Sequence, residues 1–170
     1  MISANLAAFL TMLSVSEDTS RVLNVNGVLI DPYRVCFGKY HVIVNLSDHP
    51  AVTGEWHGEP LRPAMCIAAG LTWPCVSTAA GRYQINKPVW LNLKRMLRLP
   101  DFTAPSQDAA AVELIREKGA LDLVNAGRAQ DAIALCHGIW ASLPGSTAGQ
   151  PIKTLASLMA AYTDAGGGFA

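Results

Sequence analysis

The spacing of apolar residues changes along the chain, and this change constrains the fold more than any other feature. In the range 4–14 the apolar residues recur at helical spacing, at Leu6, Phe9, Leu10 and Leu13. The range 22–45 is instead rich in β-branched and aromatic residues and contains the turn-forming pair Asn26-Gly27. The sequence therefore predicts a first helix followed by a small antiparallel sheet.

The rest of the chain predicts a long structured loop and then several helices. Residues 48–78 show no sustained period and are rich in His, Pro, Gly and Trp. Helical spacing then returns in four segments: Val89, Trp90, Leu93 and Leu97 ahead of Pro100; Thr103 to Lys118, with Thr103 as N-cap; Ala132, Ile133, Cys136, Trp140 and Leu143 ahead of Pro144; and Ile152, Leu155, Met159 and Tyr162 ahead of a frayed Gly166 to Gly168. A short helix is also expected before Gly127. Such segregated elements predict an α+β fold, and a length of 170 residues predicts one domain over 1–170.

Composition excludes several classes of function. Charged residues make up 15% of the chain and balance to zero, which argues against binding of nucleic acid or of an anionic membrane surface. No basic stretch precedes the apolar start, and charges or Gly and Pro interrupt every apolar run. We therefore expect a soluble protein without a secretory signal or membrane insertion.

The four cysteines predict no metal site, because none belongs to a Cys-x-x-Cys pair. Cys66 and Cys75 flank a loop rich in Gly and Pro. They could form a disulfide in an oxidising compartment, or they could be two buried thiols, and both interpretations stay open.

Two segments carry residues suited to carbohydrate chemistry. Glycosidic cleavage needs a carboxylic acid partly sheltered from water, and Glu17 closely follows the first predicted helix. Residues Ser77 to Gln84 combine small residues with an aromatic ring and an amide, which suits a sugar. A solvated carboxylate and a tight loop entering a helix would give the same two patterns.

Four motifs occur in the order Ser16-Glu17, Ser47-Asp48-His49-Pro50, Ser77 to Gln84, and Ile139-Trp140-Ala141-Ser142-Leu143-Pro144-Gly145. With these motifs the chain resembles the lambda-type phage endolysins over nearly its whole length. The resemblance implies a lysozyme-like fold, mostly helical, with the small sheet and the long loop bordering a cleft. It further implies a lytic transglycosylase without a cofactor, which cleaves the bond between N-acetylmuramic acid and N-acetylglucosamine and forms a 1,6-anhydro ring.

The resemblance also implies roles for individual residues. Glu17 is expected to be the general acid and base. The expected substrate-binding positions are Tyr33, Asp48, Ser77, Thr78, Gly81, Arg82, Tyr83 and Gln84. His49 is expected to make a structural hydrogen bond, and Trp140 is expected to pack in the core.

The chain departs from the family pattern at two positions. Asp18 stands where glycine is usual, and Arg34 stands where an aspartate is frequent. These departures keep two alternatives open: a hydrolytic muramidase in which Asp18, Asp31 or Asp48 activates water, and a wall-binding or virion structural protein that has lost catalysis. The segment 53–76 is expected to be longer than in the lambda endolysin and either extends the glycan groove or is a surface insertion.

The resemblance finally implies where the protein works. Its partner is expected to be the glycan strand of bacterial peptidoglycan, bound by a monomer. The expected route is synthesis in the host cytoplasm and release to the periplasm through a separate pore protein.

Overall fold

The computed structural model describes residues 2–147 and 150–170, and the chain forms two compact units. Unit 1 contains the residues up to Glu17 together with Ala111–Ala170, and unit 2 contains Asp18–Ala110. Helices dominate both units, and a small antiparallel sheet lies in unit 2, so the expected α+β class is confirmed. The single catalytic domain expected over 1–170 stays a prediction.

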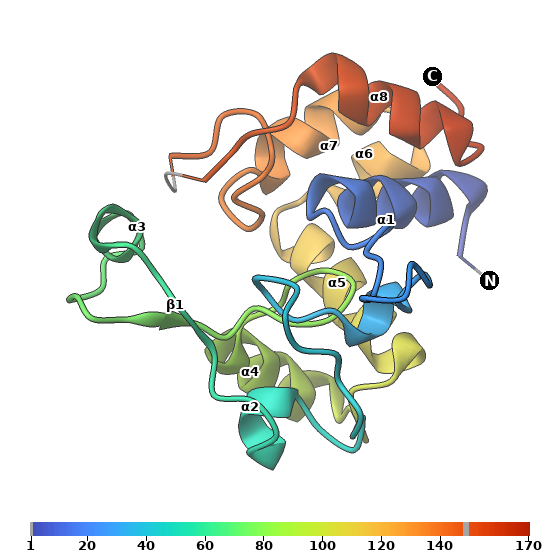
Figure 1. Ribbon diagram of the computed structural model, residues 1–170. Helices are drawn as coiled ribbons and strands as arrows, with labels where there is room; N and C mark the ends of the chain where they lie inside the picture. Colours follow the sequence, from blue (N-terminus) through green and yellow to red (C-terminus); the bar gives the residue numbers. More distant parts are fainter. Residues whose placement is uncertain (1, 148–149) are drawn as a thin grey trace. The chain divides into compact units, whose positions relative to one another are not determined.

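The first helix of unit 1 is α1 (Ala4–Ser16), two residues longer than expected. It begins at Ser3, whose Oγ accepts a hydrogen bond from the Leu6 amide at 3.1 Å. The predicted apolar positions are all buried: Leu6, Phe9, Leu10 and Leu13. Within unit 1, α1 packs against α6 (Leu121–Asn125) and α8 (Leu155–Asp164) (Figure 1).

Helix α7 (Ala129–Cys136) is shorter than the spacing predicted. The spacing continues through Trp140 and Leu143, but the helix ends at Cys136 and the chain continues in turns. Both side chains are still buried, with exposed fractions of 3% and 0%. The expected core position of Trp140 is therefore confirmed, whereas the helical conformation predicted for it is wrong.

The C-terminal glycines are not frayed, so that expectation is wrong. The Gly167 amide donates to the Tyr162 carbonyl at 3.0 Å, and the Tyr162 hydroxyl donates to the Gly168 carbonyl at 3.0 Å. The Gly168 amide also donates to Asn5 Oδ1 at 2.9 Å. The first two bonds hold the segment after α8 against Tyr162 of α8, and the third attaches it to α1.

The antiparallel sheet expected within 22–45 is absent from that part of the described chain. The chain does reverse at Gly27, where the Asn24 amide donates to the Val28 carbonyl at 2.9 Å, but the pairs there are isolated bridges. A 3-10 helix, η1 (Pro32–Arg34), interrupts the extended run because Asp31 caps it and Pro32 has no amide hydrogen. Strand propensity was therefore overridden locally by turn chemistry.

The sheet lies instead in the segment expected to be a loop. Residues 48–78 contain α2 (Pro50–Thr53), α3 (Pro63–Ala68) and the strands β1 (Glu59–Pro60) and β2 (Val76–Ser77). The strands pair antiparallel, with Glu59 opposite Ser77. Within unit 2, α3 and β1 extend away from α2 (Figure 1).

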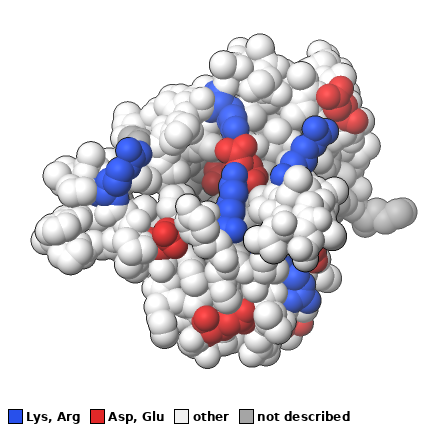
Figure 2. Space-filling view, viewed as in Figure 1, with Lys and Arg blue, Asp and Glu red and all other residues white. Residues whose placement is uncertain are grey.

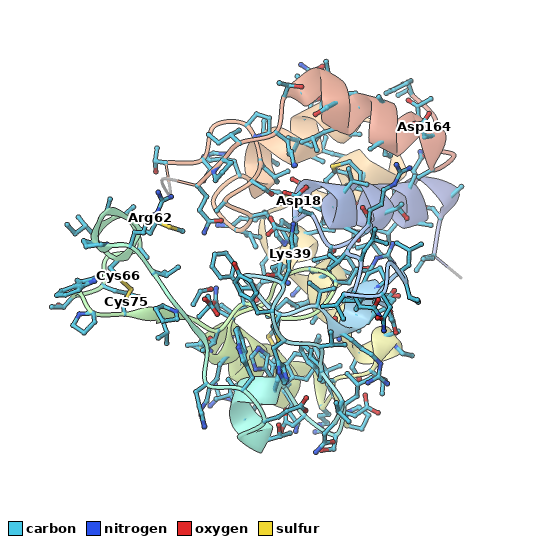
Figure 3. The ribbon with its side chains drawn as sticks, in the orientation of Figure 1. Asp18, Lys39, Arg62, Cys66, Cys75 and Asp164 are labelled. Carbon is cyan, nitrogen blue, oxygen red and sulfur yellow. A yellow bond between two sulfur atoms is a disulfide. The ribbon has the colours of Figure 1, made fainter. Side chains whose placement is uncertain are left out.

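A disulfide closes this extension. Cys66 on α3 is bonded to Cys75, which directly precedes β2, with an S–S distance of 2.08 Å (Figure 3). The sequence leaves open whether Cys66 and Cys75 form a disulfide or are two buried thiols, and in the structure they form the disulfide.

Unit 2 is completed by α4 (Lys87–Leu97) and the first part of α5 (Ala104–Glu117). Trp90 of α4 is buried with its ring edge-to-face with Phe102 at 4.7 Å, whereas Val89 is 40% exposed. As predicted, α4 ends before Pro100, at Leu97, with Arg98 as its C-cap. Thr103 directly precedes α5, as predicted; its carbonyl accepts from the Gln107 amide at 3.0 Å, and its hydroxyl donates to Asp101 Oδ1 at 2.7 Å.

Candidate active site

Glu17 occupies the C-cap of α1, where its amide donates to the Leu13 carbonyl at 2.9 Å. Its side chain is half-buried. Ser142 Oγ donates a hydrogen bond to Glu17 Oε1 at 2.5 Å, and the Ser16 hydroxyl lies 2.6 Å from Ser142 Oγ. The helix end and two nearly buried serines therefore fix the position of this carboxyl group within unit 1.

The two departures from the family pattern have different structural contexts. Asp18, labelled in Figure 3, adopts the left-handed region with φ 54°, a conformation that glycine adopts readily and that aspartate tolerates. Arg34 donates from Nη1 to the Ile43 carbonyl at 2.7 Å and lies 3.8 Å from Asp31. The Arg34 side chain thus supports the chain at 43–44.

The loop Ser77 to Gln84 is shaped by a buried amide from α5. Gly81 has φ +76°, and a Cβ built there would lie 2.1 Å from Gln107 Oε1. That oxygen accepts from the Arg82 amide at 2.9 Å, and Gln107 Nε2 donates to the Tyr33 carbonyl at 2.9 Å. In this structure the absence of a side chain at Gly81 makes room for Gln107.

A hydrogen-bonded cluster of four side chains lies next to this loop. Arg82 Nη1 donates to the Tyr33 hydroxyl at 2.7 Å, and the hydroxyls of Tyr33 and Tyr83 donate to Asp108 Oδ1 at 2.8 and 2.5 Å. Burial raises the pKa of Tyr33 above its ordinary value and raises that of Tyr83 more strongly. Both tyrosines therefore stay protonated and remain donors at neutral pH.

The expected substrate-binding residues of the loop differ in how far they are buried. Tyr83 is 0% exposed, so neither face of its ring is open to a sugar, and Ser77 is also buried. Thr78 Oγ1 accepts from the Lys87 amide at 3.0 Å and so holds the start of α4. The half-buried Gln84 donates from Nε2 to the carbonyls of Val35 and Gly81 at 3.0 and 2.9 Å, which fixes its amide plane.

Asp48 is engaged by three protein donors. Trp90 Nε1 donates to Oδ1 at 2.7 Å, Lys94 Nζ donates to Oδ2 at 2.6 Å, and the His49 amide also donates to Oδ1. Burial alone would raise the pKa of Asp48, but the bonds from Lys94, Trp90 and His49 outweigh it and lower the pKa. Asp48 is thus an ionised carboxylate that holds α4.

His49 is structural, as predicted. Its ring is 0% exposed, with Nδ1 accepting from the Ala51 amide at 3.2 Å and Nε2 3.0 Å from the Ile85 carbonyl. A donor at Nε2 and an acceptor at Nδ1 correspond to a neutral imidazole. Burial lowers its pKa from 6.5 to about 4, although the Ile85 carbonyl opposes the shift.

Sequence reasoning missed three residues of these networks: Ser142, Gln107 and Asp108. Ser142 lies inside a quoted family motif, so its signal was present but was not assigned a role. Gln107 and Asp108 are adjacent polar residues in α5, and Gln107 is fully buried there. A polar residue that falls on the buried side of a predicted helix was the available signal.

Within the ranges 2–147 and 150–170, no group of three or more His, Cys, Asp or Glu side chains could hold a metal ion. Over the same ranges, no helix has the length and apolar character needed to cross a bilayer.

Comparison with known proteins identifies the family. A family model described as Endolysin matches residues 7–169. The endolysin of Escherichia phage P2 is 42% identical over 96% of this chain and 93% of the relative, and that of Escherichia phage lambda is 45% identical over 94% and 90%.

Solved structures agree with these relatives. Bacteriophage lambda lysozyme in complex with a chitohexasaccharide matches with a TM-score of 0.79 and 34% identity, covering 100% of this chain and 99% of that one. A second structure of lysozyme from bacteriophage lambda matches with a TM-score of 0.78 and the same coverage. The chain therefore belongs to the endolysin family, the phage enzymes that lyse the bacterial cell wall, and has their lysozyme-like fold.

Proposed function

We propose that this endolysin is a peptidoglycan lytic transglycosylase that cleaves the β-1,4 bond between N-acetylmuramic acid and N-acetylglucosamine. The observation that carries the proposal is the half-buried Glu17 carboxyl, held at Oε1 by Ser142 at the end of α1. A fixed, partly sheltered carboxyl group is what general acid catalysis of glycoside cleavage needs.

Glu17 performs both proton transfers of this reaction. As an acid it protonates the departing glycosidic oxygen, and as the resulting carboxylate it takes the proton from the C6 hydroxyl of muramic acid. The C6 oxygen then bonds to C1 and closes the 1,6-anhydro ring. The bond to the leaving sugar breaks, the proton returns to Glu17, and no water is consumed.

Residues of unit 2 bind the glycan. Of the expected positions, Tyr33, Asp48, Thr78, Arg82 and Gln84 are half-buried, and all of these except the fully engaged Asp48 can offer a surface. Gln84 is the residue best suited to bind a sugar hydroxyl. Its Nε2 donates to two backbone carbonyls, and its Oε1 accepts no hydrogen bond from the described residues. Ser77, Gly81 and Tyr83 are buried and offer no such surface, and Asp48 holds α4. The chitohexasaccharide in the lambda lysozyme structure supports an oligosaccharide as ligand.

Asp31 and Asp48 of unit 2 support the transglycosylase over hydrolysis. A hydrolase of this kind would need Asp18, Asp31 or Asp48 to activate water. Asp48 has a lowered pKa and three donors, which make it a weak base, and Asp31 accepts from the Tyr33 amide as the cap of η1. Asp18 is exposed at the start of unit 2.

Mass spectrometry of digested peptidoglycan tests the reaction. The anhydro product lacks one water relative to a reducing muramic acid end, so we expect masses lower by one water at the new ends. Reducing ends alone would mean that the enzyme is a hydrolase.

The variant Glu17→Gln tests the acid, with Asp18→Asn as its matched control. Each change removes one carboxylate and keeps the side-chain size, and Asn tolerates the left-handed conformation of position 18. We expect the first variant to lose cleavage and the second to keep it. Cleavage by Glu17→Gln would remove Glu17 from the mechanism, and loss of cleavage in Asp18→Asn would favour the hydrolytic alternative.

We further propose that the protein reaches the periplasm through a separate pore protein and acts there as a monomer. The disulfide between Cys66 and Cys75 supports an oxidising destination. The face seen in Figure 2 is mostly uncharged, which agrees with a neutral glycan partner rather than nucleic acid. Light scattering of the purified protein tests the monomer, and lysis in cells with and without a pore protein tests the route.

A further inference from the structure

The hydroxyl pair behind Glu17 is the strongest unassigned feature of unit 1. Ser16 and Ser142 are 126 residues apart in sequence, yet their Oγ atoms lie 2.6 Å apart and both side chains are almost fully buried. Ser142 Oγ is also 2.5 Å from Glu17 Oε1. Two serines and a carboxyl group therefore form one continuous hydrogen-bonded row.

The direction of this row follows from the chemistry of the groups. An ionised carboxylate can only accept hydrogen bonds, so Ser142 must donate its single hydroxyl proton to Glu17. Ser142 Oγ can then only accept from Ser16, and Ser16 must donate to it. The ionised form of Glu17 thus selects one order of donors, from Ser16 through Ser142 to Oε1.

The backbone holds Ser142 rigidly. Its carbonyl accepts from the Lys153 amide at 2.8 Å, and the neighbouring Leu143 amide donates to the Trp140 carbonyl at 3.1 Å. Ser16 is the last residue of α1, so its position is fixed by the helix whose C-cap is Glu17. A donor held this firmly can restrict a carboxyl group to one orientation.

We propose that Ser142 is a positioning residue that orients the Glu17 carboxyl group and favours its ionised form, with Ser16 fixing the direction of the Ser142 hydroxyl. The inference rests on the proposed role of Glu17 as acid and base. A donor to the carboxylate stabilises the form that must take up the C6 proton, and it places the carboxyl plane for both transfers.

The variant Ser142→Ala tests this role. We expect kcat, measured at the pH optimum of the variant, to fall by about 10-fold to 100-fold with little change in KM, because the carboxyl group is misplaced for chemistry and not for binding. Loss of the donor also disfavours the carboxylate, so the alkaline limb of the pH–rate profile moves to higher pH. The pKa of Glu17, measured by NMR titration of its carboxyl carbon, should rise as well. This measurement does not depend on an activity assay.

Ser16→Ala is the matched control, because it removes a buried hydroxyl from the same row and leaves the Ser142–Glu17 bond in place. We expect a smaller loss of kcat and a smaller movement of the alkaline limb. If the two serine variants lose the same activity and neither moves the limb, the row is only structural and the inference is wrong. An unchanged kcat and profile in Ser142→Ala would overturn it as well.

Two further measurements keep the outcomes distinct. If Ser142→Ala does not fold, Ser142→Cys keeps nearly the same shape with a much weaker donor and should give the same kinetic result. Activity in Glu17→Gln would refute the proposed function, whereas an inactive Glu17→Gln with a normal Ser142→Ala would refute the inference alone.

Discussion

Gly81→Ala should destabilise the protein more than the same substitution at another glycine with the same backbone angle. Gly81 and Gly27 have φ of +76° and +75°, so an alanine at either position meets a left-handed strain of about 1–2 kcal/mol. At Gly27 a new Cβ meets nothing within 4 Å, whereas at Gly81 it lies 2.1 Å from Gln107 Oε1 and 2.7 Å from Gln107 Cδ. The difference between the two variants therefore isolates the displacement of Gln107.

The size of that difference follows from the bonds that Gln107 makes. Its fully buried amide donates to the Tyr33 and Phe102 carbonyls at 2.9 and 2.7 Å and accepts from the Arg82 amide at 2.9 Å. Each such bond contributes roughly 0.5–1.5 kcal/mol. If the amide moves away, Gly81→Ala should lose about 2–4 kcal/mol more than Gly27→Ala.

Urea unfolding of the two variants and the parent protein measures this difference. The variant Gln107→Ala removes the obstacle. In that background the extra loss of stability caused by Gly81→Ala, relative to Gly27→Ala, should become small. If the two glycine variants differ by less than about 0.5 kcal/mol in the parent protein, the structural reasoning about Gly81 is refuted.

Two other perturbations have directions that the structure fixes. Because the folded pKa of His49 lies near 4 and below its ordinary 6.5, its contribution to stability is complete above pH 6.5 and is lost as pH falls towards 4. The free energy of unfolding should drop by about 2 kcal/mol between about pH 7.5 and pH 5, and unfolding of His49→Asn should show a flatter pH dependence; equal slopes would contradict the assignment. Reducing the Cys66–Cys75 bond, which joins residues 9 apart, should lower stability by about 2–3 kcal/mol. A thiol count in denaturant should give two free cysteines before reduction and four after it, and four before reduction would exclude the bridge.

The longer helices were predictable because their spacing carries direct information about burial, whereas the short α2 and α3 were not predicted. Helix α1 was expected from four apolar residues that the structure buries, and α4 was expected to end ahead of Pro100. The same information fails to say whether a buried position is helical. Trp140 and Leu143 keep helical spacing and are buried, yet they lie beyond the end of α7.

The sheet was misplaced for a related reason. Strand propensity in 22–45 was real, but hydrogen bonds with partners distant in sequence decide where a ladder forms. The strands that do pair are two residues each, and one contains Pro60, so local composition gave them no signal.

The candidate site was predictable only in part. Motifs pointed to Glu17 and to the loop around Gly81, but the partners Ser142, Gln107 and Asp108 come from helices and turns far along the chain. A single sequence shows which residues are neighbours along the chain, but not which distant residues contact each other in the fold. Tyr83 illustrates the result, because an aromatic residue expected to face a sugar has its hydroxyl bonded to Asp108 and its ring buried.

Unit 1 joins segments that lie far apart in the sequence, and this has a consequence for biosynthesis. Helix α1 is translated well before its partner α8, and Asn5 is translated 163 residues before Gly168, to which it is hydrogen-bonded. The apolar side of α1 therefore lacks its partners α6 and α8 until they have been translated, and Ser142, which is 125 residues after Glu17, reaches the carboxyl group only then. A nascent endolysin chain should thus stay inert until these later segments have left the ribosome.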